Sequence, residues 1–315
     1  MDFELSEDQQ TILDAVGSLL EQHAGAARAV ELNAKGEFDS ALDAALAESG
    51  FMEIAITDGG SYLDAALIVE AVSKAGGVTP AGAEALVAAG AAGRTLPGPI
   101  ALARAGEEGP IRYGAHARTL LALDDGVARV VPLGPGDAEP VKSNFGFPMG
   151  RVTVAAGRGE ALGPGSGAAM RNWWRIAIAA EAVGAMQAAL DVTVEYVTKR
   201  RQFGRAIGSF QAVQHRLSML AVLIEGSRWL TYEAAYGGAP AEAAAIAAAH
   251  ASSAAGQVFA ETQQLTGAMG YTREHDLHVW SMRLPALRLE LGGVGGHRRA
   301  IAAARYLDPA RESGG

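Results

Sequence analysis

The chain has 315 residues, of which 49% are hydrophobic and 19% charged, and its formal net charge is −9. These values are typical of a globular protein with a sizeable core, and the length favours two or three subdomains. The acidic balance argues against nucleic acid as the main partner. Because the chain has no cysteine, disulfides, thiolate zinc sites and cysteine nucleophiles are excluded.

The sequence shows neither a secretory signal nor a membrane span. Its N-terminus is acidic and lacks the apolar core of a secretory signal. No segment reaches the ~18 uninterrupted apolar residues that a span requires. We therefore expect a cytoplasmic protein without a membrane partner.

Residues 1–95 predict an all-helical N-terminal domain. Ser6 and Gln9 have the spacing of a capping box, and the apolar residues after them share one helical face. Further helices of this domain are predicted over 40–49, 61–75 and 80–92.

Residues 96–168 predict a reduced β middle domain. Glycine and proline separate short alternating runs, among them Thr119–Leu123 and Ala128–Leu133. This pattern is typical of β hairpins. Because the segment is short, we expect only a small, thin sheet structure.

Residues 169–315 predict a C-terminal four-helix bundle, since the helical period returns there and persists. Its helices are expected over 169–200, 209–236, 240–266 and 276–306. The fold class is therefore mainly α, with a helical domain, a reduced β segment and a four-helix bundle in that order.

The end of the first bundle helix carries a candidate ligand-binding motif. Arg200 and Phe203 lie in the run KRRQFG, and Gln211 follows in SFQAVQH. A guanidinium can bind a pyrophosphate, an aromatic ring can cover an apolar edge, and an amide can fix a hydrogen bond. The alternative is an ordinary basic helix end that Gly204 terminates.

A second motif, QLTGAMGY, begins at Gln264 and has the form of a helix end that runs into a glycine-bearing loop. Gly267 and Gly270 would let backbone amides approach a ligand closely. Ordinary helix termination would require the same residues, so this motif alone does not define a site.

Together these segments resemble the acyl-CoA dehydrogenase family. RRQFGRAIGSFQAVQHRLSML resembles its third-domain signature, and QLTGAMGYTREHDLH resembles its late glycine loop. LSEDQQTILDAV and LAESGFMEIAI, the latter followed by DGG, resemble its N-terminal helical domain. The resemblance covers residues 1–95 and 169–307.

In that family FAD lies at a subunit interface, where one subunit holds the flavin ring and its neighbour's bundle holds the adenine and pyrophosphate. The resemblance implies that this chain contacts a neighbour's FAD through Arg200, Phe203, Gln211, Gln264, Leu265, Thr266, Gly267 and Ala268. Ala268 stands where relatives have the second glycine of the loop, which weakens the expected close backbone approach there.

The chain departs from the family in its middle domain and beside the flavin ring. Nothing between Leu96 and Gly167 resembles the TEPGAGSD-like loop or the W-I-T/S-N-like strand that cover the ring in relatives. Gly293-Val294-Gly295 replaces a hydroxyl-bearing Thr-Ser pair. These losses fall on the subunit's own flavin site.

The catalytic base is the other departure. Many relatives place a glutamate twenty-seven residues after the loop glutamine, which is Leu291 here. Glu290 lies one residue away, so on a helix its direction would differ by about 100° unless an insertion or a bulge restored it. Another branch places the glutamate before an arginine, where this chain has Trp174 before Arg175. The base is therefore unknown, and Glu290 is the remaining candidate.

Other polar and aromatic residues receive structural interpretations. The spacing of His275 and His278 lacks a matching carboxylate, so no metal site is expected. Glu181 and Glu195 are expected to be solvated or capping residues, and His215 a packed, hydrogen-bonded one. We expect Trp174 to fill space that the substrate occupies in relatives.

The resemblance implies a subunit of a flavin-dependent acyl-CoA dehydrogenase, similar to the short subunit of heteromeric actinobacterial steroid-CoA dehydrogenases. It would pair with a sister subunit as an α2β2 hetero-oligomer with two flavins. A bulky acyl-CoA substrate and an electron-transferring flavoprotein as acceptor follow by analogy. The alternatives are a homo-oligomeric dehydrogenase that uses Glu290 as base, and a non-enzymatic helical scaffold.

Overall fold

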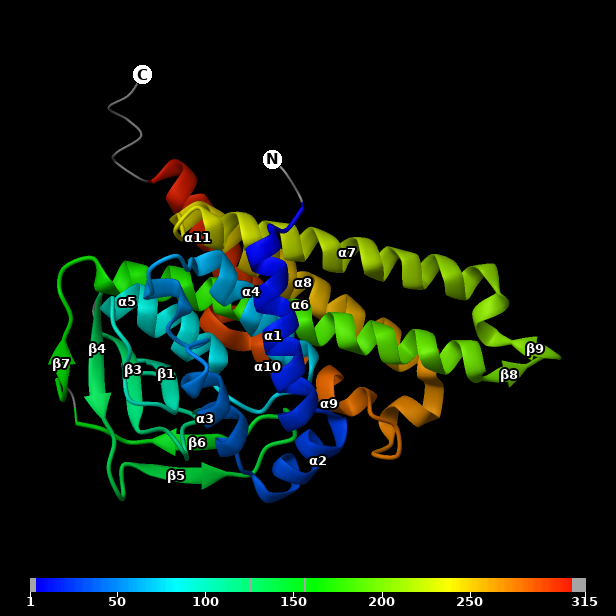
Figure 1. The fold of residues 1–315 in the computed structure, drawn as a ribbon, viewed down its shortest axis with the longest axis horizontal. Coiled ribbons are helices and arrows are strands. Elements are labelled where there is room, and N and C mark those ends of the chain that lie inside the picture. Colours follow the sequence, from blue (N-terminus) through cyan, green and yellow to red (C-terminus); the bar gives the residue numbers. More distant parts are fainter. Residues whose placement is uncertain (1–3, 125, 156, 308–315) are drawn as a thin grey trace.

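The computed structural model describes residues 4–124, 126–155 and 157–307 and shows a mainly α protein with a small β segment (Figure 1). The ends of the predicted first and last domains, residues 1–3 and 308–315, lie outside the described residues. One long helix, α6 (Ser166–Lys199), runs through the molecule and contacts both helical regions and the sheet.

The N-terminal region is helical, as predicted. Its elements are α1 (Glu7–His23), α2 (Ala26–Lys35), α3 (Ser40–Glu48), η1 (Ile54–Ile56), α4 (Tyr62–Lys74), η2 (Gly82–Ala88) and α5 (Ala89–Ala92). The capping box is confirmed, because the Ser6 hydroxyl accepts from the Gln9 amide and the Gln9 side chain accepts from the Ser6 amide. Helix α2 was not predicted, and its N-cap, Gly25, offers no side-chain signal.

The helix predicted over 80–92 is only partly regular. Its first part, η2, has the wider π-type turn, and only α5 continues as α-helix. Turns of this kind are rare and occur mostly as single turns within α-helices. In α5, Gly90 lies against the indole of Trp173, whose atoms would come within 1.9 Å of an added Cβ.

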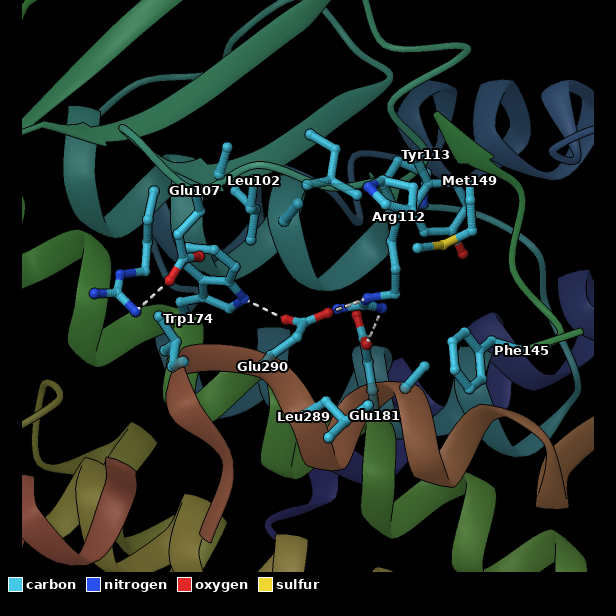
Figure 2. A pocket seen from close by; sticks show the side chains of 18 of the residues that line it. Leu102, Glu107, Arg112, Tyr113, Phe145, Met149, Trp174, Glu181, Leu289 and Glu290 are labelled. Carbon is cyan, nitrogen blue, oxygen red and sulfur yellow. Dashed lines mark hydrogen bonds and ion pairs between the residues drawn. The ribbon is translucent and has the colours of Figure 1, made fainter. Parts of the chain in front are cut away.

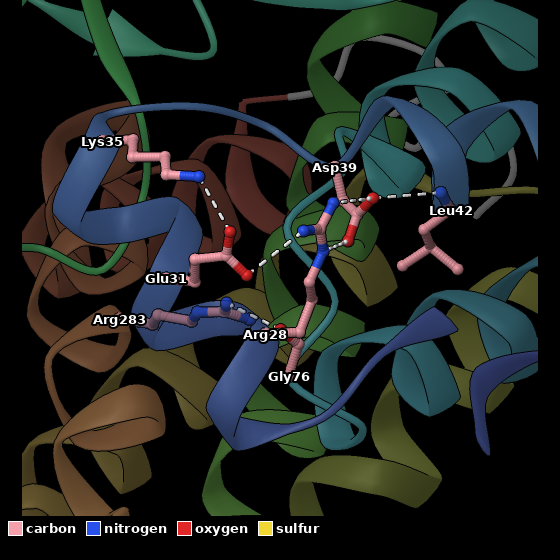
Figure 3. A network of polar contacts seen from close by, with 7 residues as sticks. All are labelled: Arg28, Glu31, Lys35, Asp39, Leu42, Gly76 and Arg283. Carbon is pink, nitrogen blue, oxygen red and sulfur yellow. Dashed lines mark hydrogen bonds and ion pairs between the residues drawn. The ribbon is translucent and has the colours of Figure 1, made fainter. Parts of the chain in front are cut away.

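Polar contacts join the N-terminal helices to one another and to the bundle (Figure 3). Asp39 accepts from the Leu42 amide at the start of α3 and forms an ion pair with Arg28 at 2.9 Å. Arg283, which is fully buried, donates to the carbonyls of Gly76 and Gly77 at 3.0 and 2.9 Å. These contacts fix the end of α4 against the C-terminal helices.

The middle segment contains two small sheets. Its strands are β1 (Ile100–Arg104), β2 (Ile111–Arg112), β3 (Thr119–Asp124), β4 (Val127–Pro132), β5 (Ala138–Val141), β6 (Met149–Val152) and β7 (Glu160–Ala161). One sheet has the order β1-β3-β4-β7 and the other β2-β6-β5. The predicted hairpin is confirmed as the antiparallel β3–β4 pair, whereas β1 pairs with β3 in parallel.

The bundle begins with α6, whose C-terminus leads into a short hairpin. The next elements are β8 (Arg201–Gln202), β9 (Arg205–Ala206), η3 (Ile207–Ser209), α7 (Gln211–Tyr236), α8 (Ala241–Thr266) and η4 (Gly267–Tyr271). Of the described helices, α6 passes a length-and-composition test for a membrane span, and 83% of its apolar window is buried inside the protein. A core helix has the same composition, and α6 is such a helix.

The last predicted bundle helix, 276–306, is wrong as one continuous helix. It is divided into α9 (Leu277–Ser281), α10 (Arg283–Leu289), η5 (Glu290–Gly292) and α11 (Gly293–Tyr306). Leu291, Gly292 and Gly293 all have positive φ, between 51° and 81°. An α-helix cannot continue through such residues, so the chain turns at this point.

Candidate functional site

The candidate residues fall into two groups, one at the C-terminal end of α6, where Figure 1 shows β8 and β9, and one around a cavity beside the sheets. We call the first group the bundle tip; it consists of Arg200, Phe203, Gln211 and residues 264–268 at the end of α8 and the start of η4. Trp174, Glu181 and Glu290 lie around a cavity beside the sheets, which we call the inner cavity. From Trp174 to Arg200 the helix rises 1.5 Å per residue, or roughly 39 Å in all.

The hairpin of the bundle tip presents an aromatic ring to solvent. Phe203 has φ 53° and is 89% exposed. Its ring meets Phe210 edge-on at 6.2 Å, and the Arg205 guanidinium covers Phe210 at 4.0 Å. A left-handed backbone is unfavourable for an aromatic residue. Because the Phe203 ring is exposed, no burial within this chain offsets that cost. The conformation therefore leaves the Phe203 ring available to a ligand or to another protein chain.

Arg200 and Gln211 stand beside this ring. The Arg200 amide closes α6 on Tyr196 at 2.8 Å, and its carbonyl accepts from Ile207 at 2.8 Å. Its side chain is exposed, and among the described residues no carboxylate pairs with its guanidinium. Gln211 is the exposed first residue of α7, which begins two positions after the predicted start at 209. Both side chains are free to bind a ligand.

Residues 264–268, which form the end of α8 and the start of η4, belong to the same end of the bundle. Gln264, Gly267 and Ala268 are exposed, whereas Leu265 and Thr266 are buried. Gly267 has φ 59°, and an added Cβ there would meet nothing within 4 Å. A ring contact of 5.3 Å between Tyr196 and His275 ties the following segment to the end of α6.

These residues fit an extended cofactor with a pyrophosphate and aromatic groups, such as FAD. Arg200 offers a guanidinium without a carboxylate partner among the described residues, and Gly267 leaves the backbone open to close approach. For Leu265 and Thr266 only the backbone could take part, because Thr266 Oγ1 already donates to the Thr262 carbonyl at 2.7 Å.

The inner cavity has a volume of about 360 Å³, within the range of small-molecule sites (Figure 2). Strands β1 and β2 cover it on one side, and α6, α10 and η5 form the other. Its walls are mainly apolar, with Leu102, Phe145, Met149 and Leu289 among them.

A polar network crosses this cavity (Figure 2). Arg112 of β2 forms ion pairs with Glu290 of η5 and, at 2.5 Å, with Glu181 of α6. Trp174 donates its indole N–H to the other oxygen of Glu290 at 2.5 Å. The side chains of Arg112, Glu181 and Glu290 are 12%, 11% and 17% exposed. Three distant segments are thus joined by one guanidinium.

Burial and pairing act against each other in this network. Burial raises the pKa of Glu181, although Arg112 opposes the shift. For Arg112, burial disfavours the charged form, but Glu181 and Glu290 outweigh it and the pKa is raised. Arg112 therefore stays charged and holds both carboxylates.

Two predictions for single residues are wrong. Glu181 is neither solvated nor capping, since it is buried in an ion pair with Arg112. His215 is exposed on α7 rather than packed. Glu195 is solvated as predicted and pairs with Lys199 one turn away. Among the described residues, no group of three or more acidic or histidine side chains could hold a metal ion.

Arg112 is the residue that sequence inspection missed. It lies in a strand of two residues, and nothing in its neighbourhood along the chain marks it. Its partners are 69 and 178 positions away. Trp174 and Glu290, which stand at or beside the two family positions for a base, meet each other through the same network.

Comparison with known proteins defines the family. The model of the acyl-CoA dehydrogenase N-terminal domain matches residues 6–94, and that of the C-terminal domain matches residues 166–307. Acyl-CoA dehydrogenase IpdE2 of Mycobacterium tuberculosis is 32% identical over 311 residues, which cover 88% of this chain and 91% of that protein. The chain belongs to the acyl-CoA dehydrogenase family. Members of this family are oxidoreductases, and their cofactor is FAD.

Other relatives agree with this assignment. IpdE2 of Mycolicibacterium smegmatis is 29% identical, covering 98% of this chain and 97% of that protein. The ChsE4-ChsE5 complex from Mycobacterium tuberculosis contains a chain that superposes with a TM-score of 0.79 at 24% identity, covering 96% of this chain and 98% of that one. The Tcur3481-Tcur3483 steroid ACAD variant gives 0.81 at 21% identity, with 95% and 97% covered. These structures share the acyl-CoA dehydrogenase fold.

Proposed function

We propose that this chain is a subunit of a hetero-oligomeric acyl-CoA dehydrogenase and donates its bundle tip to the FAD of a sister subunit. The observation that carries the proposal is a contrast. The cross-subunit residues Arg200 and Phe203 are exposed and free, whereas Glu290 is bound within the chain by Arg112 and Trp174. The residues that would contact a neighbour's cofactor are therefore available, whereas the candidate base of this chain is not.

Each tip residue has a role that its chemistry supports. Arg200 would bind the pyrophosphate through charge-assisted hydrogen bonds, and Phe203 would cover an apolar edge of the cofactor. Gln211 and Gln264 would fix amide hydrogen bonds, and the backbone from Leu265 to Ala268 would approach the cofactor. FAD, when bound, supplies the hydride acceptor for α,β-dehydrogenation of an acyl-CoA thioester.

Glu290 is a poor candidate for the base. One of its oxygens pairs with Arg112, and the other accepts from Trp174. A base must reach the proton that it removes, and both oxygens of this carboxylate are already engaged within the chain. The catalytic glutamate would therefore lie in the sister subunit.

Several features of the assembly are proposed by analogy. The similar solved structures include the ChsE4-ChsE5 complex and the Tcur3481-Tcur3483 steroid ACAD variant. By analogy with them, we propose an α2β2 arrangement with two flavins and a bulky, steroid-derived acyl-CoA as substrate. An electron-transferring flavoprotein as acceptor and a cytoplasmic location belong to the same proposal.

Counting FAD separates this proposal from its alternatives. The chain is purified alone and after co-expression with the neighbouring gene of the same family, and flavin per chain is measured. We expect no flavin in the isolated chain and one flavin per heterodimer. One flavin per isolated chain would support the homo-oligomeric enzyme, and no flavin even with the sister would support a scaffold. Either result would overturn the divided site.

A further inference from the structure

A hollow between the two sheets of the middle segment lies on the face of the first sheet that points away from α6. Along β3, Leu121 and Leu123 pack into the main core together with residues of α6, whereas Leu120 and Ala122 belong to a separate small apolar cluster. Because successive side chains of a strand point to opposite faces, the two sets lie on opposite sides of the sheet. Leu120 and Ala122 line the hollow, which is therefore distinct from the inner cavity on the α6 side.

Small side chains leave the space between the sheets unfilled. Facing sheets normally pack about 10 Å apart, and the side chains of their inner faces interdigitate. On this face, Ala101 and Ala103 of β1 stand beside Leu120 and Ala122 of β3, so alanine occupies most of these positions. The strands of the second sheet run across those of the first (Figure 1). The hollow that remains has a volume of about 490 Å³, within the range of small-molecule sites.

The floor of the hollow is apolar and shielded from water. Leu120 and Val131 are only 3% and 2% exposed, and the half-buried Ile111, Val152 and Val154 pack against the same cluster. These side chains come from both sheets, so a molecule in the hollow would be covered on two sides. Burial of apolar surface is therefore the main favourable contribution that the hollow can offer to a ligand.

The charged residues around the hollow face one another. Three of its four arginines form ion pairs at 2.6–2.7 Å, namely Arg104–Glu107, Arg129–Asp124 and Arg158–Asp137. The fourth, Arg151, lies directly opposite Glu139 in the β5–β6 pair. Glu108 is the lining carboxylate that has no ion pair within the described part of the chain, and it is exposed to solvent. An anion would thus find each arginine facing a carboxylate, and a cation would find only a carboxylate that water and salt screen.

We propose that the hollow between the sheets binds a compact, neutral, apolar molecule. A charged group would lose its hydration on entering and would find no unpaired partner inside, whereas an uncharged ring system would bury its surface against both sheets. The site lies apart from the bundle tip and does not require FAD. It gives the subunit a ligand-binding role beyond the donation of cofactor contacts.

Three naphthalene derivatives of nearly equal shape test this preference: 2-naphthalenemethanol, 2-naphthylmethylamine and 2-naphthoate. Their binding to the full chain and to the co-expressed complex is measured by titration calorimetry at neutral pH. We expect the neutral alcohol to bind about tenfold or more tightly than either ion. Equal or tighter binding of either ion, or no binding of the alcohol at millimolar concentration, overturns the proposal. Binding to the isolated chain that disappears in the complex would show that the sister subunit fills the hollow, and this result also overturns it.

Two variants locate the site. Ala122→Phe fills the hollow from β3 and Val152→Phe fills it from β6, and each should weaken binding of the alcohol about tenfold or more while the unfolding midpoint shows that the fold is kept. The matched control, Ala27→Phe on the exposed side of α2, should leave binding unchanged. Nuclear Overhauser contacts between the naphthyl ring and labelled leucine and valine methyl groups locate the ligand in the parent chain without any substitution. Normal binding by a folded filled variant, or contacts confined to methyl groups outside the hollow, would refute the proposal.

Discussion

The bundle tip and the inner cavity lie at opposite ends of one helix, and they use charged residues in opposite ways. At the tip, Arg200 is exposed and has no carboxylate partner among the described residues. In the cavity, Arg112 is shared between Glu181 and Glu290. The first guanidinium is available to another molecule, whereas the second is fully engaged within the fold and holds three segments of the chain together.

Removing the shared guanidinium should give the largest effect. Arg112→Ala leaves two buried carboxylates without their cation, so we expect a loss of about 3–5 kcal/mol in the free energy of unfolding. Urea denaturation measures this loss. The matched control is Arg94→Ala, which breaks an exposed pair with Glu160 and should cost at most about 1 kcal/mol. Similar losses for both variants would show that the ion pairs of Arg112 do not stabilise the fold more than an exposed pair does.

Removing the free guanidinium should change binding and leave stability almost untouched. In the co-expressed complex, Arg200→Ala should weaken FAD about tenfold or more, because a charge-assisted contact contributes roughly 1.5–3 kcal/mol. Flavin release on dilution measures the change, and the unfolding midpoint of the chain alone should stay the same. Lys199→Ala, which removes the adjacent cation paired with Glu195, is the control. Unchanged flavin affinity in Arg200→Ala would contradict the role of the tip.

Asp43 shows what a half-buried carboxylate does without an ion pair of its own. Burial raises its pKa to about 6, against the opposing effects of Thr79 and Arg118 and with help from Asp39. The folded state then holds the proton more tightly than the unfolded state, so the free energy of unfolding should fall as pH rises from about 4 to about 6.

The Asn variant tests that behaviour. Asp43→Asn should flatten this part of the pH profile and stabilise the protein above pH 6, where Asp43 is charged. Glu84 is the other carboxyl coupled to it, and its own pKa is raised by burial and by Asp43. Thermal unfolding across the pH range measures both effects. A profile as steep as that of the parent protein would assign the pH dependence to other groups.

The smallest expected effect is on turnover. If the base lies in the sister subunit, Glu290→Gln in the co-expressed complex should change kcat by less than about twofold, since the amide can still accept from Trp174. A loss of several orders of magnitude would instead support the homo-oligomeric enzyme with Glu290 as base. Single-turnover reduction of the bound flavin distinguishes chemistry from product release.

Much of the fold could be predicted from local sequence. Ser6 and Gln9 predict the start of a helix, and the alternating runs that begin at Thr119 and Ala128 predict paired strands. Both patterns can be recognised because capping and alternation depend on residues that are close in the sequence. The break after Glu290 was missed, although Gly292 and Gly293 stand beside it. Apolar periodicity on both sides of these residues favoured one helix, and tertiary packing decided otherwise.

The sequence by itself determined the mainly α architecture and the family, and it predicted the tip residues as cofactor contacts. Each depends on contiguous motifs, in which the chemistry and the spacing lie within a few turns of helix. Only the tertiary structure decided that Arg112, from a two-residue strand, neutralises Glu181 and occupies Glu290. Ion pairs between segments far apart in the chain leave no local pattern, because burial and distance arise only when the chain has folded.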